Sequence, residues 1–192
     1  MPQQIECEEK FFCSLSPALF QFIEKELQFK FQKKVKETDI YFKDKNLKYL
    51  QPNTCLRLRT NNTPFCELTR KKVVGNDTCV KIEKNFSFPQ TKLVRLMSLL
   101  HRIEVEKYCT VFKERFIYTK EKNCITYNIM IDILNNQYTF IELEILSHTH
   151  NVLFLKQKLN DFISLFKNFN FQKAKQNYRE FSKEHINQDI IK

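Results

Sequence analysis

The stretch IECEEK at residues 5–10 alternates apolar and charged side chains. Successive side chains of a β-strand point to opposite faces, so this pattern predicts a strand over residues 3–12. One face would carry apolar side chains, and the other would carry Glu6, Glu8 and Lys10. Charged faces of strands usually turn to water, and a solvated outer face is the simplest interpretation of this strand taken alone.

The same period-two alternation recurs along the chain, and apolar stripes of helical period separate the alternating segments. Further strands are expected at residues 38–43, 54–60, 65–73, 78–84, 107–119, 124–134 and 138–146. Helices are expected at residues 16–34, 90–103 and 151–167. Eight antiparallel strands can close into a barrel, so we expect an α+β fold: an eight-stranded antiparallel closed β-barrel with helices packed on the outside.

No repeat or linker divides the chain, which predicts a single domain over residues 1–192. Its core would span roughly residues 1–170. Residues 171–192, rich in Lys, Gln and Asn, would form a C-terminal tail or a short helix.

Charged faces on nearly every strand suggest more than a solvated surface. Helices with apolar stripes need an apolar surface to cover, and if they cover the outside of the barrel, the charged faces point inward. Burying charges of both signs is costly unless ligands complete the pairing. Carboxylates favour hard divalent cations such as Mg²⁺ or Mn²⁺, and Arg and Lys favour phosphate oxygens. The acidic set is Glu6, Glu8, Glu83, Asp132, Glu142 and Glu144; the basic set is Lys10, Arg57, Arg59, Lys71, Lys81, Lys113 and Arg115.

Composition narrows the range of partners. The net charge of +10 favours polyanions: nucleic acid, phosphorylated ligands or an acidic membrane surface. Seven cysteines without a CxxC pair, and a polar N-terminus in place of a signal peptide, predict reduced thiols and a cytoplasmic protein. No apolar run reaches the ~18 residues needed to span a bilayer, so no membrane association is expected.

Several charged segments form short motifs, and the charged side chains that define each motif fall on alternate positions of a predicted strand. The segment TDIYF at residues 38–42 has the form D-x-Y-F, with Lys43 where an acidic residue would complete it. The others are Glu6-Cys7-Glu8-Glu9-Lys10 (ExExK), Leu56-Arg57-Leu58-Arg59 (LRxR), Leu68-Thr69-Arg70-Lys71 (LTxK), Lys81-Ile82-Glu83 (KxE), Lys113-x-Arg115-x-x-Tyr118 (KxRxxY) and Phe140-Ile141-Glu142-Leu143-Glu144 (FxExE). Taken in the order in which they occur along the chain, these motifs resemble those of the CYTH superfamily, the triphosphate tunnel metalloenzymes. The resemblance covers nearly the whole chain.

The resemblance implies a role for each matched residue. Glu6, Glu8, Asp132, Glu142 and Glu144 would hold one or two Mg²⁺ or Mn²⁺ ions. Lys10, Arg57, Arg59, Lys71, Lys113 and Arg115 would be the catalytic residues that bind the triphosphate oxygens. Lys81 and Glu83 would play a secondary role or pair with each other across the barrel. Tyr41 and Tyr118 are expected to be packing residues.

Four functions stay open at this point. The leading hypothesis is a metal-dependent triphosphatase acting on inorganic triphosphate, thiamine triphosphate or a nucleoside triphosphate. A class IV type adenylyl cyclase would use the same site for attack on the α-phosphate. An RNA 5′-triphosphatase of mRNA capping is a third reading, and the only one with a nucleic-acid partner. The fourth is a module that binds polyphosphate or nucleotide without turnover.

Overall fold

A computed structural model describes residues 5–51, 53–74, 77–148 and 151–185. Its strands form one sheet in the order β5-β4-β3-β2-β6-β7-β8-β1-β9, and a further pairing of β5 with β1 closes the sheet into a ring. The pairings are antiparallel. The predicted α+β class with a closed antiparallel sheet is therefore confirmed.

The element bounds differ from the predictions mainly in strand length. The strands are β1 (Ile5–Phe12), β2 (Lys30–Asp44), β3 (Thr54–Thr60), β4 (Phe65–Val74), β5 (Asp77–Pro89), β6 (Val105–Lys122), β7 (Ile125–Leu134), β8 (Tyr138–Ser147) and β9 (Gln172–Lys173). The helices are α1 (Pro17–Gln21), the π-helix η1 (Phe22–Glu26), the 3₁₀ turn η2 (Gln90–Lys92), α2 (Leu93–Arg102), α3 (Val152–Ser164) and α4 (Tyr178–His185).

The helix predicted over residues 16–34 is wrong in its second half. Ser16 caps α1 as its sequence suggests, by accepting a hydrogen bond from the Leu19 amide at 3.2 Å. The helical path ends after η1, because Gln28 takes a left-handed conformation with φ of 57°. The chain then enters β2, which is 15 residues long. An apolar spacing that also suits a helix had concealed the start of this strand.

The predicted tail at residues 171–192 contains structure. It contributes the two-residue strand β9 and the helix α4. Residues 186–192, which also belong to that predicted tail, lie outside the described residues. Among the helices that the structure describes, none is both long and apolar enough to cross a membrane.

The chain forms two compact units, each assembled from three segments. Unit 1 comprises Met1–Val35, Val73–Ile82 and Lys113–Ala174. Unit 2 comprises Lys36–Lys72, Glu83–Phe112 and Lys175–Lys192. Strands β2, β4, β5 and β6 each contribute residues to both units.

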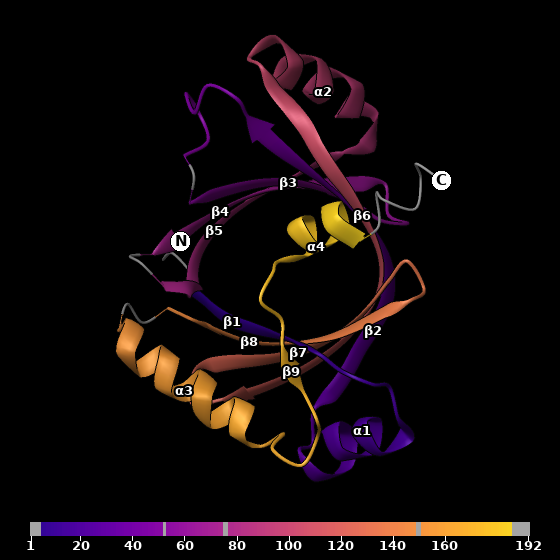
Figure 1. Cartoon of the computed structure of the whole chain (residues 1–192), viewed down its shortest axis with the longest axis vertical. Helices are drawn as coiled ribbons and strands as arrows, with labels where there is room; N and C mark the ends of the chain where they lie inside the picture. The colour runs from indigo at the N-terminus through magenta and orange to yellow at the C-terminus, as the bar shows by residue number, and fades with distance from the viewer. Residues whose placement is uncertain (1–4, 52, 75–76, 149–150, 186–192) are drawn as a thin grey trace. The chain divides into compact units, whose positions relative to one another are not determined.

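In unit 1, helices cover one face of β1, β7 and β8 (Figure 1). Leu19 of α1 and Ile23 of η1 pack into the same core as Leu155, Leu159 and Phe162 of α3. The strands meet them with alternate apolar residues: Ile5 and Cys7 from β1, Ile129 and Ile131 from β7, and Ile141, Leu143 and Ile145 from β8. The residues between these, which include the predicted charged set, point to the opposite face.

Unit 2 follows the same plan with a smaller core. Phe42, Leu56 and Leu58 are buried with Leu100 of α2, and Leu96 and Met97 of the same helix pack against them. Arg57 and Arg59 alternate with Leu56 and Leu58 on β3, so the guanidinium groups belong to the other face of the strand. Each unit therefore has one helix-covered apolar face and one charged face.

Candidate functional site

The charged face of unit 1 brings four glutamates together. Glu6 and Glu8 of β1 and Glu142 and Glu144 of β8 each offer a carboxylate oxygen, and these oxygens lie within 4.8 Å of one another. The strand register explains the cluster, because Glu8 pairs directly with Glu144 and Lys10 pairs with Glu142. We call these four residues the carboxylate cluster. Glu6, Glu8 and Glu142 are buried, and Glu144 is half-buried.

The carboxylate cluster is electrostatically unfavourable by itself. Like charges placed opposite each other across a strand pair are destabilising, and burial strengthens their repulsion. Burial, followed by the proximity of Glu8, raises the pKa of Glu142. A divalent cation would relieve this repulsion, and oxygen-only ligands are the set that Mg²⁺ and Mn²⁺ prefer. The donor atoms therefore fit the predicted metal.

Two lysines lie at the cluster. Lys10 Nζ is 2.6 Å from Glu8 Oε1 and 3.4 Å from Glu142 Oε1. Burial alone would lower the pKa of Lys10, but the neighbouring Glu142 and Glu8 carboxylates outweigh it and raise the pKa. Lys81 forms an ion pair with the same Glu8 oxygen, since Lys81 pairs with Glu6 in the β1–β5 register. Lys10 is thus held charged beside the carboxylates, and Lys81 lies on the same glutamate.

Arg115 and Asp132 form a second buried group on this face. Arg115 Nε lies 2.6 Å from Asp132 Oδ1, and its Nη2 lies 2.5 Å from Asp132 Oδ2 and 2.8 Å from Glu142 Oε2. Lys113 Nζ is 3.8 Å from Asp132 Oδ2. Asp132 is fully buried and is not a member of the carboxylate cluster, so it orients Arg115 directly. Its predicted role as a metal ligand stays a prediction.

Asn128 contacts the carboxylate cluster, although no sequence motif assigned it a role. Its Nδ2 donates to Glu144 Oε1 at 2.8 Å, and its Oδ1 accepts from Thr119 Oγ1 at 2.8 Å. Asn128 pairs with Glu144 in the β7–β8 register, so the contact is built into the sheet. The alternation of β7 already placed Asn128 on the charged face, but an amide beside a glutamate gives no recognisable motif.

The charged face of unit 2 interleaves its arginines with carboxylates. Arg59 binds Asp39 through two contacts, Nε to Oδ1 at 2.7 Å and Nη2 to Oδ2 at 2.8 Å. Its Nη1 lies 3.2 Å from Glu37 Oε1. Asp39 is fully buried and pairs with Arg59 in the β2–β3 register. This bidentate geometry fixes the plane of the guanidinium group. The D-x-Y-F pattern contained Asp39, but the sequence assigned it no role.

Arg57 and Lys71 complete the predicted basic set of this unit. Arg57 Nη2 donates to Thr69 Oγ1 at 3.1 Å and lies 3.6 Å from Glu67 Oε1. Lys71 pairs with Glu83. Lys81 and Glu83, which the sequence suggested could pair with each other, therefore have Glu8 and Lys71 as partners.

The two predicted packing tyrosines are buried. Tyr118 donates a hydrogen bond to Glu24 Oε1 at 3.1 Å on the helix-covered side of unit 1. Tyr41 lies on β2 opposite Arg57. Neither contact is with a member of the carboxylate cluster.

Comparison with known proteins agrees with this geometry. The profile of the CYTH domain matches residues 4–178. The PH1012 protein from Pyrococcus horikoshii OT3 superposes with a TM-score of 0.69 at 21% identity, covering 91% of this chain and 98% of that one. No curated protein matches the chain by sequence.

Two other solved structures carry names that state an activity. A putative adenylate cyclase from Vibrio parahaemolyticus superposes with a TM-score of 0.66 at 18% identity, covering 93% of this chain and 97% of that one. A putative adenylyl cyclase from Hippeastrum, with a dominant triphosphatase activity, superposes at 0.56 and 15% identity, covering 91% and 92%. At these identities the likeness shows the fold alone.

Proposed function

The chain belongs to the CYTH domain family, and from this premise we propose that it is a divalent-metal-dependent triphosphatase. The observation that carries the proposal is the carboxylate cluster beside Lys10. Four glutamate oxygens within 4.8 Å and an ammonium group 2.6 Å from one of those glutamates offer ligands for a metal and a partner for a phosphate. Burial of three of the glutamates supports binding, because ion pairing is stronger away from water.

Each residue of the predicted set has a role in this proposal. Glu6, Glu8, Glu142 and Glu144 would hold Mg²⁺ or Mn²⁺, which when bound polarises a phosphoryl oxygen and lowers the pKa of a coordinated water. Lys10, Lys113 and Arg115 of unit 1 would neutralise charge on the phosphate oxygens, as would Arg57, Arg59 and Lys71 of unit 2. Asp132 and Asp39 would keep Arg115 and Arg59 in place.

An adenylyl cyclase is the second candidate, because two of the structural relatives carry that name. The same charge neutralisation would serve attack by a ribose 3′-hydroxyl on the α-phosphate. The Hippeastrum protein joins a cyclase name with a dominant triphosphatase activity, and for this reason hydrolysis is the first activity to measure.

A substrate panel tests the proposal. Phosphate release would be followed with Mg²⁺ or Mn²⁺ on inorganic triphosphate, thiamine triphosphate, ATP and 5′-triphosphate RNA, and cyclic AMP formation on ATP. Metal-dependent phosphate release from at least one substrate is expected. Cyclic AMP without phosphate release would instead favour the cyclase. Tight triphosphate binding without any turnover would identify a binding module and overturn the enzymatic proposal.

A further inference from the structure

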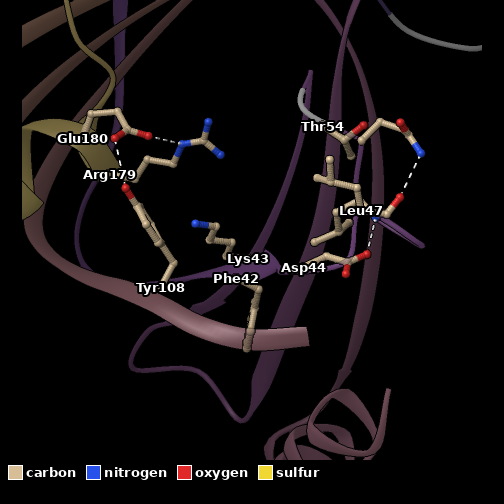
Figure 2. A pocket seen from close by; sticks show the side chains of 10 residues that line it. Phe42, Lys43, Asp44, Leu47, Thr54, Tyr108, Arg179 and Glu180 are labelled. Carbon is tan, nitrogen blue, oxygen red and sulfur yellow. Dashed lines mark hydrogen bonds and ion pairs between the residues drawn. The ribbon is translucent and has the colours of Figure 1, made fainter. Parts of the chain in front are cut away.

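Unit 2 contains a pocket apart from its paired arginines (Figure 2). Its walls come from the end of β2, the turn that follows, the start of β6 and the first turn of α4. Its volume is about 200 Å³. A cavity of about 150 Å³ holds benzene, and drug-sized ligands need about 300 Å³ or more. The pocket is therefore of a size for one small molecule.

The acidic side chains at the pocket already have partners. Asp44 accepts hydrogen bonds from the backbone amides of Asn46 at 3.1 Å and Leu50 at 3.0 Å. Glu180 accepts one from Tyr108 at 3.1 Å. Asp44 is therefore engaged by backbone amides of its own turn, and Glu180 is shared between Tyr108 and Arg179.

The basic side chains are Lys43 and Arg179, and both point into the space between the pocket walls (Figure 2). Among the described residues, Lys43 has no hydrogen bond or ion pair. Arg179 has one ion pair, from Nε to Glu180 Oε1 at 3.1 Å, which leaves its two terminal nitrogens without a partner in the described part of the chain. A planar guanidinium group with free terminal nitrogens suits an oxyanion.

Three apolar residues, Phe42, Leu47 and Leu50, also line the pocket. Leu47 has a left-handed backbone with φ of 52°, which is costly for a residue with a bulky side chain. Backbone hydrogen bonds to Asp44 hold the turn in this shape. The turn thus keeps an exposed leucine over the pocket at a cost to the fold.

We propose that this pocket binds a small phosphate monoester. Its phosphate group lies between Lys43 and Arg179, and its apolar or planar body lies against Leu47 and Leu50. Two converging cations match the charge of about −1.5 to −2 that a phosphate monoester carries at neutral pH, whereas a carboxylate would need only one. The site differs from the proposed triphosphate-binding set, because neither Arg57, Arg59 nor Lys71 lines the pocket.

Calorimetric titration of the full chain with phenyl phosphate, in the presence of a metal chelator, tests the proposal. Phenyl phosphate is expected to bind at least about tenfold more tightly than inorganic phosphate, because its ring buries apolar surface. Benzyl alcohol, which has the ring without the charge, is expected not to bind. Equal affinity for phenyl phosphate and benzyl alcohol would overturn the proposal.

Variants locate the binding. Lys43→Gln and Arg179→Gln are each expected to weaken phenyl phosphate binding about tenfold or more. Lys45→Gln is the matched control, since Lys45 lies two residues from Lys43 but pairs with Glu106 at 2.7 Å and does not line the pocket. Lys10→Gln, in the proposed catalytic set, is expected to leave this binding intact. Loss in Lys10→Gln with retention in Lys43→Gln would assign the binding to the triphosphate site and contradict the inference.

Arg179 belongs to the first turn of α4 and pairs with Glu180 there, so its loss could perturb folding. Lys43 is exposed and makes no such contact among the described residues, and Lys43→Gln decides the question if Arg179→Gln is unstable. Unchanged binding in a folded Lys43→Gln variant would overturn the proposal.

Discussion

The two charged faces contain similar residues but arrange them differently. In unit 2 arginines and carboxylates alternate: Arg59 lies between Glu37 and Asp39. Arg57 lies between Asp39 and Glu67. In unit 1 four glutamates share one small volume, with Lys10 and Lys81 both on Glu8. Alternating positive and negative side chains limit the repulsion between like charges, whereas four crowded carboxylates repel one another even beside lysines. Unit 1 therefore gathers negative charge in one small volume, where a divalent cation would relieve the repulsion, and unit 2 holds its arginines in fixed orientations.

Removing one cluster carboxylate gives the largest expected effect. In Glu6→Ala or Glu144→Ala, the proposed metal-dependent triphosphate hydrolysis should fall about a thousandfold, since a bound ion would contribute several kcal/mol to catalysis. Stability without metal should be unchanged or higher, because repulsion is relieved. Phosphate release and urea unfolding measure the two quantities. Glu67→Gln, in the half-exposed partner of Arg57, is the control. A strongly destabilised Glu6→Ala would break the comparison.

Removing one arginine of unit 2 should do the opposite. Arg59→Met leaves the buried Asp39 carboxylate without its bidentate partner, and should lower the free energy of unfolding by about 3–5 kcal/mol. Chemical denaturation measures the loss. Lys45→Met breaks the exposed pair with Glu106 and should cost less than about 1 kcal/mol. If both variants lost the same small amount, the pairs of unit 2 would not be structural.

Asn128 sharpens the comparison inside unit 1, because it orients one carboxylate of the cluster. Asn128→Ala should weaken Mn²⁺ binding about tenfold by freeing Glu144. Asn128→Gln keeps the amide on a side chain longer by one methylene, and tests whether the contact with Glu144 depends on the length of the side chain. Calorimetry with Mn²⁺ alone gives the affinity without an activity assay. Unchanged affinity in Asn128→Ala would mean that the strand alone positions Glu144.

The smallest expected effect is a difference in the pKa of two tyrosines, one from each unit. Burial, and then the hydrogen bond with Glu24, raises the pKa of Tyr118 from 10.0 to about 12. The folded chain holds this proton more tightly than the unfolded chain does. Its contribution to stability is therefore fully present below the ordinary pKa and is lost as the pH rises through about 12.

Alkaline titration checks this difference through the ultraviolet absorbance of tyrosinate. Burial, and then Asp39, raises the pKa of Tyr41 further, so Tyr41 should ionise after Tyr118. Tyr118→Phe should remove the earlier step and leave the later one. If the tyrosinate step near pH 12 persisted in Tyr118→Phe, its assignment to Tyr118 would be wrong.

The sequence predicted the closed sheet because period-two alternation survives in almost every strand. Glu142 and Glu144, separated by Leu143, could only share a face. Strand β3 was predicted with its observed bounds, 54–60. Local periodicity sufficed wherever one face is apolar and the other charged.

What the sequence concealed depends on contacts between distant segments. The start of β2 looked helical, because Phe31 continues an apolar stripe that begins at Leu19. The partners of Lys81 and Glu83 depend on the register of β5, and sequence spacing does not give a register. Asn128 and Asp39 contact side chains on neighbouring strands, and such contacts leave no pattern along the chain.

The alternation of β1 also has a consequence for inheritance. Under the proposed function, the neighbouring codons for Glu6 and Cys7 answer to different selective pressures, one from metal binding and one from packing in the core of unit 1. Either residue can drift under its own pressure by single substitutions. Deletion of one codon within β1 would move every later side chain of the strand to the opposite face of the sheet. Lineages of this chain should therefore record many substitutions in β1 but almost no single-residue insertions or deletions.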